Sequence, residues 1–206
     1  MSIPQGPILV VEDTAQIREL LEVTLQFEGY PVVTAKNGEE ALRKITEEKP
    51  ALIITDLMMP KMDGFGMVYR LRGDEKTRNI PIVILSATYV TKEDRDFALS
   101  LGVAKFIEKP LDTPEFLLTI GEIMASEPSP TTPQLEKKDF YRGYRERLES
   151  KLQEKKMQIG RIERLLQSLD ERQKGSFEAL LREAKMHQDE IVRELNETAI
   201  ALKALE

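Results

Sequence analysis

The sequence predicts an α/β domain with a doubly wound, parallel (βα)5 sheet, followed by an all-α antiparallel helical hairpin. Three observations lead to this expectation. Five short apolar runs alternate with amphipathic segments over the first 125 residues. The stretch ASEPSPTTPQ (125–134), with three prolines, then interrupts the pattern. From residue 135 onward there is no proline, and apolar residues recur at helical spacing. We therefore expect a domain at 1–125, a proline-rich linker at 126–135 and a two-helix hairpin at 136–206.

The five apolar runs are rich in β-branched residues and are hydrophobic without alternation, which is typical of strands buried on both faces of a parallel sheet. They are ILVV (8–11), PVVTA (31–35), ALIIT (51–55), IPIVILS (80–86) and VAKFIE (103–108). The helical patterns after them lie at roughly 14–28, 37–48, 64–72, 92–101 and 112–125. Gly29 and Gly102 stand where two of these helices need a C-terminal cap.

Two long helices are expected after the linker because their apolar positions recur every three or four residues, as in a coiled coil. In the first helix these positions are Phe140, Tyr144, Leu148, Leu152, Ile159, Ile162, Leu166 and Leu169. In the second they are Phe177, Leu181, Ala184, Gln188, Ile191, Leu195, Thr198, Leu202 and Leu205. We expect a break at SLDERQKGS (168–176). One apolar stripe per helix leaves much surface uncovered, so we expect two hairpins to dimerise as a four-helix bundle.

The composition excludes several classes of protein. The chain has no cysteine, which excludes disulfides and thiolate metal sites and is compatible with a reducing compartment. No apolar run approaches the length of a membrane span and no leader pattern is present, so we expect a cytoplasmic protein with no membrane partner. Residues 1–125 carry 20 acidic and 14 basic side chains, and residues 126–206 carry 16 of each. Neither half has the basic surface that nucleic-acid binding requires, so we do not expect DNA as a partner.

Polar residues with a coherent chemistry end four of the predicted strands. VVEDT contributes Glu12 and Asp13, TDLMMP contributes Asp56, ILSAT contributes Ser86 and FIEKP contributes Lys109. In a doubly wound sheet these carboxyl ends converge on one edge. Clustered carboxylates repel one another unless a cation neutralises them, and Mg²⁺ prefers such oxygen ligands. An ammonium and a hydroxyl nearby suit the oxygens of a transferring phosphoryl group.

With these motifs in this order, residues 5–125 resemble the receiver domain of bacterial two-component response regulators. The resemblance implies a flavodoxin-like sheet of strand order 2-1-3-4-5. It implies that Asp56 accepts a phosphoryl group from a histidine kinase, and that the chain is a phosphoacceptor switch and not an enzyme. It also implies four Mg²⁺ ligands, which are Glu12, Asp13, Asp56 and the backbone carbonyl of Met58.

The resemblance implies further roles around the phosphoryl group. Lys109 would hold a phosphoryl oxygen, Ser86 would move in to hydrogen-bond the group, and Phe106 would turn inward with Ser86. A cis peptide is implied before Pro110. Met58 and Thr88 occupy positions that tune phosphoryl lifetime, and an apolar Met58 cannot orient a water, so we expect slow self-hydrolysis. Two residues depart from the family pattern, since Glu12 is longer than aspartate and Phe106 lacks a tyrosine hydroxyl.

Three outputs are open for residues 136–206. The main hypothesis is a helical hairpin that dimerises and signals to a downstream protein partner. A DNA-binding transcriptional regulator with an atypical helical output is the first alternative. The second is a phosphorelay or kinase-like dimerisation module. For that module His187 is a candidate carrier, but its surroundings do not match a known phosphotransfer box, and the stretch 189–205 resembles a kinase dimerisation helix with Asn196 at the phosphoacceptor position.

Overall fold

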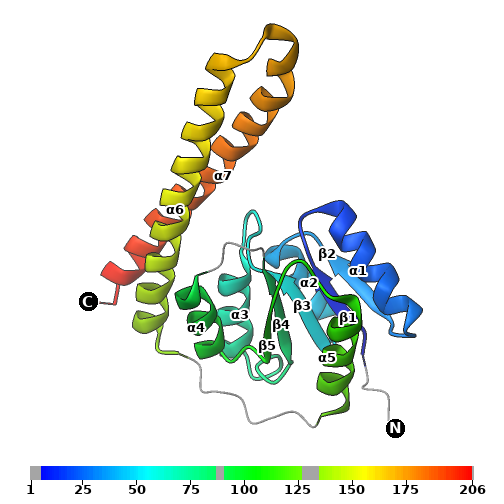
Figure 1. Ribbon diagram of the computed structural model, residues 1–206. Coiled ribbons are helices and arrows are strands. Elements are labelled where there is room, and N and C mark those ends of the chain that lie inside the picture. The colour runs from blue at the N-terminus through cyan, green and yellow to red at the C-terminus, as the bar shows by residue number, and fades with distance from the viewer. Residues whose placement is uncertain (1–5, 87–90, 127–134, 206) are drawn as a thin grey trace. The chain divides into compact units, whose positions relative to one another are not determined.

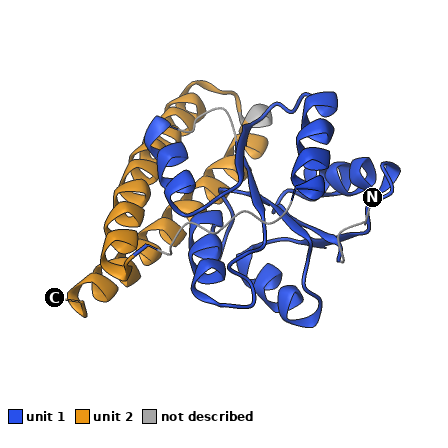
Figure 2. Ribbon diagram, turned by 90° about the horizontal axis from the view of Figure 1, so that it is seen from below, with its two compact units in different colours: residues 1–135 blue, residues 136–206 orange. Residues whose placement is uncertain are grey.

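The computed structural model describes residues 6–86, 91–126 and 135–205. The chain forms two compact units, residues 1–135 and 136–206, coloured separately in Figure 2. The proline-rich linker expected at 126–135 falls almost wholly on residues 127–134, which lie outside the described residues.

The first unit alternates strands and helices, as Figure 1 shows. Its elements are β1 (Ile8–Val11), α1 (Ala15–Phe27), β2 (Val32–Ala35), α2 (Gly38–Glu47), β3 (Leu52–Asp56), α3 (Gly64–Gly73), β4 (Ile82–Ser86), α4 (Lys92–Ser100), β5 (Lys105–Glu108) and α5 (Thr113–Ala125). All neighbouring strands are parallel, and their order is β2-β1-β3-β4-β5. This confirms the predicted fold class and strand order.

Both faces of the sheet are covered, which explains the continuous hydrophobicity of its strands. On one face, α1 and α5 pack Leu21, Leu25, Phe116 and Ile120 onto alternate residues of β1, β3 and β4. The intervening strand residues are buried as well: Leu9, Ile53 and Ile84 are at most 2% exposed. On α3 and α4, Phe65 and Phe97 meet edge to face at 5.0 Å. The sheet is therefore a buried central layer whose ends, and not its faces, reach solvent.

The helix caps predicted from glycine are present. Gly29 and Gly102 follow the C-caps of α1 and α4 with φ of +85° and +77°, a left-handed conformation that glycine adopts without steric penalty. At the N-terminal ends, Asn37 accepts a hydrogen bond from the Glu40 amide and Asp112 accepts one from the Glu115 amide. These caps fix where the helices begin and end, and so fix the length of the loops at the sheet edge.

A buried arginine ties three segments of the first unit together. The Arg72 guanidinium, on α3, donates to the Ile80 carbonyl at 3.0 Å and to the Gly102 carbonyl at 2.8 Å. Burial lowers the pKa of Arg72 to about 10, so the side chain stays charged at neutral pH. It joins the residues before β4 to the turn before β5, at the opposite end of these strands from Ser86.

The second unit is a hairpin of α6 (Lys137–Ser168) and α7 (Glu171–Lys203) (Figure 1). The expected break at 168–176 is wrong in extent: α7 begins at Glu171 and contains Gly175. Glycine in a helix costs only about 1 kcal/mol relative to alanine, and the residues around it favour helix.

The predicted seam is partly or wholly buried, except for Leu205 at its end, which is 37% exposed. Among the described residues, no helix has the length and apolar character that a membrane span requires.

Candidate functional site

The candidate site lies where β1, β3, β4 and β5 end. Val11 pairs with Thr55, which brings the next residues, Glu12 and Asp56, to the same edge of the sheet. On the other side of β3, Asp56 pairs with Leu85, and Ser86 follows. Parallel pairing alone therefore gathers polar residues that are far apart in the sequence.

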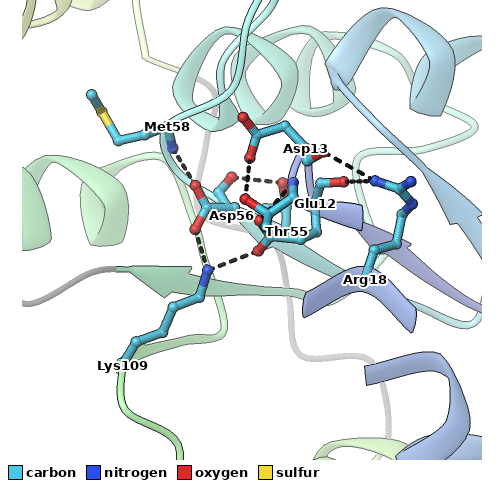
Figure 3. A network of polar contacts seen from close by, with 8 residues as sticks. Glu12, Asp13, Arg18, Thr55, Asp56, Met58 and Lys109 are labelled. Carbon is cyan, nitrogen blue, oxygen red and sulfur yellow. Dashed lines mark hydrogen bonds and ion pairs between the residues drawn. The ribbon is translucent and has the colours of Figure 1, made fainter. Parts of the chain in front are cut away.

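Lys109 lies between two buried carboxylates, as Figure 3 shows. Its Nζ is 2.6 Å from Asp56 Oδ1 and 2.7 Å from Glu12 Oε2. The side chains of Glu12 and Asp56 are 2% and 9% exposed. Burial lowers the pKa of Lys109, but the two carboxylates more than offset this, and the pKa is raised overall. The lysine is firmly a cation and neutralises half of the charge of the two carboxylates.

Asp56 is held from two directions. Its Oδ1 accepts from Lys109, and its Oδ2 accepts from the backbone amide of Met58 at 2.7 Å. Burial raises the pKa of the Asp56 carboxyl, and Lys109 only partly opposes this effect. The turn that delivers the Met58 amide is closed by the Gly64 amide, which donates to the Leu57 carbonyl at 3.0 Å. The carboxylate is thus fixed in orientation and lies in surroundings that favour its neutralisation by a cation.

Asp13 is the more exposed acid of the site. Burial raises the pKa of the Asp13 carboxyl, and the negative charge of Glu12 raises it further. Both effects would be relieved by a cation beside the carboxylate. The Glu12 carboxylate itself accepts from the Thr14 amide at 3.2 Å and from Lys109, so it is already well satisfied.

The remaining predicted site residues are placed as follows. Ser86 is fully buried, and its Oγ makes no hydrogen bond within the described residues. Its carbonyl accepts from the Lys109 amide at 2.6 Å, and the Lys109–Pro110 peptide bond is cis. Phe106 is buried at 5% exposure, so it is already inward in this arrangement. Met58 is 41% exposed, and Thr88 lies outside the described residues.

The donor atoms suit Mg²⁺ in kind, although they do not form a complete cage. Within the described ranges, no three carboxylates converge closely enough to hold a metal ion by themselves. Lys109 occupies the space between Glu12 and Asp56 and explains part of this separation. Mg²⁺ usually keeps several waters and takes only one or two carboxylates. Asp13 and Asp56, whose pKa values are both raised, together with a backbone carbonyl, fit that requirement.

Arg18 was missed by the sequence reasoning. Its Nη1 donates to the Glu12 carbonyl at 2.6 Å and to the Asp13 carbonyl at 3.2 Å (Figure 3). The available signal was its position, one helical turn beyond Thr14, which allows a long side chain on α1 to reach back to the end of β1. Arginine on an exposed-looking helix is common, so position alone did not mark it.

Comparisons with known proteins agree with this geometry. A family model described as "Response regulator receiver domain" matches residues 8–120. The "Probable transcriptional regulator ycf27" of Pyropia yezoensis is 41% identical over 117 residues, which are 57% of this chain and 46% of that protein. The chain spans about half the length of the curated relatives of this name.

Solved structures match the first unit. A putative response regulator from Chloroflexus aurantiacus is 30% identical with a TM-score of 0.56, covering 59% of this chain and 98% of that one. The chemotaxis protein CheY4 of Vibrio cholerae is 32% identical with a TM-score of 0.54, covering 57% of this chain and 98% of that one. These matches, like the family model, fit a single domain that ends before the hairpin.

Proposed function

The chain belongs to the response regulator receiver family, and from that premise we propose that it is a phosphorylation-controlled response regulator of a two-component system. Asp56 accepts the phosphoryl group from a histidine kinase. Members of this family generally act as phosphoacceptor switches and not as enzymes. The observation that carries the proposal is a buried carboxylate, Asp56, held at a strand end by a lysine from another strand end, with Nζ and Oδ1 2.6 Å apart.

In the proposed step, a carboxylate oxygen of Asp56 attacks the phosphorus of a phosphohistidine. A P–O bond forms, the P–N bond breaks, and the imidazole nitrogen keeps the electron pair. The Met58 amide and Lys109 hold the carboxylate in place before the attack. Phosphorylation removes the negative charge of the Asp56 carboxylate. Lys109 is then close enough to pair with a phosphoryl oxygen instead.

Receiver domains generally bind Mg²⁺, which supplies charge neutralisation for the carboxylates and the incoming phosphoryl oxygens. In this chain we propose Glu12, Asp13, Asp56 and the Met58 carbonyl as its holders. Asp13 and Asp56 are the direct candidates. Glu12 is bound to Lys109 at 2.7 Å and therefore acts at longer range, through water.

Ser86 and Phe106 are proposed to carry the switch. The Ser86 hydroxyl is buried and makes no hydrogen bond within the described part of the chain, so a phosphoryl oxygen at Asp56 would offer it an acceptor. Such a bond would bias the end of β4 toward one of two arrangements, and Phe106 on β5 would respond by repacking. Met58 and Thr88 are proposed to set how long the phosphoryl group persists.

Phosphorylation with a small donor tests this assignment. The full chain is incubated with acetyl phosphate and Mg²⁺, and its intact mass is measured before and after hydroxylamine, which cleaves acyl phosphates. We expect one hydroxylamine-sensitive phosphoryl group, lost in Asp56→Asn and retained in the matched control Asp96→Asn, an exposed aspartate on α4. Equal phosphorylation of the Asp56 variant would contradict the proposal.

For residues 136–206 we propose a homodimeric output that acts through a protein partner. One buried cluster of the hairpin consists of Ile159, Ile162 and Ala184, with a few partly buried side chains packed against it. Phe140, Tyr144, Leu148 and Ile191 are buried as well. Polar contacts among the described residues also join α6 and α7: Tyr144 Oη donates to Glu194 Oε2 at 3.0 Å, and Lys185 Nζ lies 2.8 Å from Glu163 Oε1. A two-helix hairpin of this kind gains stability from a second copy.

DNA binding is the competing output. It is favoured by the printed name of the relatives, "Probable transcriptional regulator". The matched 117 residues, however, are about half of such a relative, and residues 136–206 carry 15 acidic and 16 basic side chains. We therefore propose a protein partner. Salt-sensitive retention of genomic DNA fragments by the full chain in a gel-shift assay would favour the competing output.

A further inference from the structure

We propose that Arg18 is a positioning residue that fixes the backbone turn carrying Glu12 and Asp13, and thereby sets the affinity of the site for Mg²⁺. This inference rests on the proposed function. Arg18 touches neither the Asp56 carboxylate nor any group assigned to the phosphoryl oxygens in the described contacts. It contacts the two backbone carbonyls of the acidic pair, at 2.6 and 3.2 Å from Nη1.

The acidic pair needs such support because of how a strand ends. Successive residues of a strand point to opposite faces, so two consecutive side chains reach one edge only if the chain leaves the strand between them. The Glu12 amide still pairs with the sheet, donating to the Ala35 carbonyl at 3.0 Å. The carbonyls of Glu12 and Asp13 lie beyond the last paired residue of β1, Val11, and the Arg18 guanidinium donates to both.

Arg18 is well anchored for this task. Its own amide donates to the Thr14 carbonyl at 3.0 Å, which closes the first turn of α1. The side chain then reaches back over that turn to the residues before its own helix, as Figure 3 shows. The loop between β1 and α1 is therefore clamped at both ends, by the sheet through Glu12 and by the helix through Arg18.

The clamp also has an electrostatic consequence. Hydrogen bonds from a charged donor are stronger than those from a neutral one, and a half-buried guanidinium beside two acids offsets part of their mutual repulsion. Groups that orient metal ligands without touching the metal typically change metal affinity by about 10–100-fold when they are removed. Because Arg18 contacts backbone carbonyls and not the ligating carboxylate oxygens, we expect an effect near the lower end of that range.

Mg²⁺ binding to the full chain, measured by titration calorimetry, tests the inference. Arg18→Met keeps the apolar stem but removes charge and donors, and we expect about tenfold weaker Mg²⁺ binding. Arg18→Lys keeps the charge on a shorter, single ammonium and should give an intermediate affinity. Arg43→Met, an exposed arginine on α2, is the matched control and should bind as the wild type does. The acetyl phosphate rate of Arg43→Met should follow that of the wild type at every Mg²⁺ concentration, whereas the rate of Arg18→Met should rise over a higher range of Mg²⁺ concentrations.

The possible outcomes separate the inference from the function beneath it. If Arg18→Met lowers the melting temperature but leaves the Mg²⁺ dissociation constant unchanged, Arg18 is only structural and the inference fails while the proposed function stands. If Arg18→Met lowers the phosphorylation rate at saturating Mg²⁺ but leaves the Mg²⁺ dissociation constant unchanged, the proposed role of Arg18 in positioning the metal ligands also fails. A wild-type chain that binds no Mg²⁺ overturns the proposed Mg²⁺ site and the inference together.

Discussion

Gly64 packs so closely against Asp56 that a Cβ on Gly64 would lie 2.7 Å from the Asp56 carbonyl oxygen. It would also lie 3.1 Å from the Leu57 Cα, so both obstacles are backbone and cannot rotate away. The residue that begins α3 therefore decides how tightly the chain can turn after β3, and with it where the Met58 amide meets the Asp56 carboxylate.

From this contact we expect Gly64→Ala to damage both stability and function. The turn must open, which should lower the free energy of unfolding by about 1–3 kcal/mol and slow phosphorylation by acetyl phosphate as the Met58 amide moves away. Urea unfolding and intact-mass kinetics measure the two effects. Gly160→Ala is the control: a Cβ there meets nothing within 4 Å, so the change should stabilise α6 by up to about 1 kcal/mol. Unchanged phosphorylation kinetics in Gly64→Ala would contradict the argument.

Lys109→Met should destabilise the chain, because Glu12 and Asp56 would then be buried without their cation. Removing one partner from a buried ion pair typically costs about 3–5 kcal/mol. Adding Glu12→Gln to this variant removes one of the two uncompensated charges and should restore part of the loss. Mg²⁺ should raise the melting temperature more in Lys109→Met than in the wild type, since it replaces the missing positive charge. Equal stability of Lys109→Met and the wild type in Mg²⁺-free buffer would refute this account.

The fold was largely predictable because its strands are buried on both faces. Ile8 to Val11 and Leu52 to Asp56 are continuous buried runs, and no helix surface requires such a pattern. Boundaries were less predictable. The predicted break at 168–176 is wider than the observed one, because α7 begins at Glu171 and includes Gly175. The local penalty of a glycine is small compared with the packing of a helix as long as α7.

The convergence of four polar residues at one sheet edge was predictable, but their contacts were not. Strand order forces Glu12, Asp56, Ser86 and Lys109 to one edge, so residue types and topology suffice to gather them. That Lys109 binds Glu12 as well as Asp56 depends on the rotamer of a long side chain, which no sequence pattern encodes. The role of Arg18 depends on backbone carbonyls, which are the same for every residue type and leave no trace in the sequence.

Met58 should give the phosphorylated chain a long lifetime. Its side chain is 41% exposed beside Asp56 and has no group that could orient an attacking water. We expect a half-life of minutes or longer, shortened several-fold in Met58→Asn, whose amide can hold a water. Decay of the phosphorylated mass after removal of the donor measures this. Met157→Asn, at an exposed methionine of α6, should leave the decay unchanged. A wild-type half-life of seconds would contradict the expectation.

We expect the exposed apolar stripe of α1 to contact the histidine kinase and to take no part in phosphoryl transfer itself. Leu20, Val23 and Phe27 are 65%, 58% and 88% exposed, and their spacing places them along one side of a helix that begins beside the site. A protein donor that reaches Asp56 can cover this stripe, whereas acetyl phosphate cannot. We expect Phe27→Ser to slow transfer from a phosphorylated kinase that is active on the wild type, with no change in the acetyl phosphate rate. Equal slowing of both reactions would point to a folding defect instead.

The hairpin should dimerise through the side of its seam that carries Leu165 and Leu180. These residues are 47% and 50% exposed, and each lies three positions after a seam residue, Ile162 or Phe177. They extend the apolar stripe sideways, as the core of a four-helix bundle requires. Light scattering on the full chain, with and without beryllofluoride and Mg²⁺, should show a dimer that becomes monomeric in Leu165→Glu/Leu180→Glu.

Two other exposed apolar residues of the hairpin provide the matched control for that variant. Met186 and Ile200 are 60% and 69% exposed, and each lies two positions, or about half a turn, beyond a seam residue of α7. They therefore face away from the seam, and Met186→Glu/Ile200→Glu should remain dimeric. Loss of the dimer in this control but not in Leu165→Glu/Leu180→Glu would place the interface on the opposite side of the hairpin. A monomeric wild type in both states would refute the bundle. The hairpin carries 15 acidic and 16 basic side chains, so its net charge is too small to hold two copies apart.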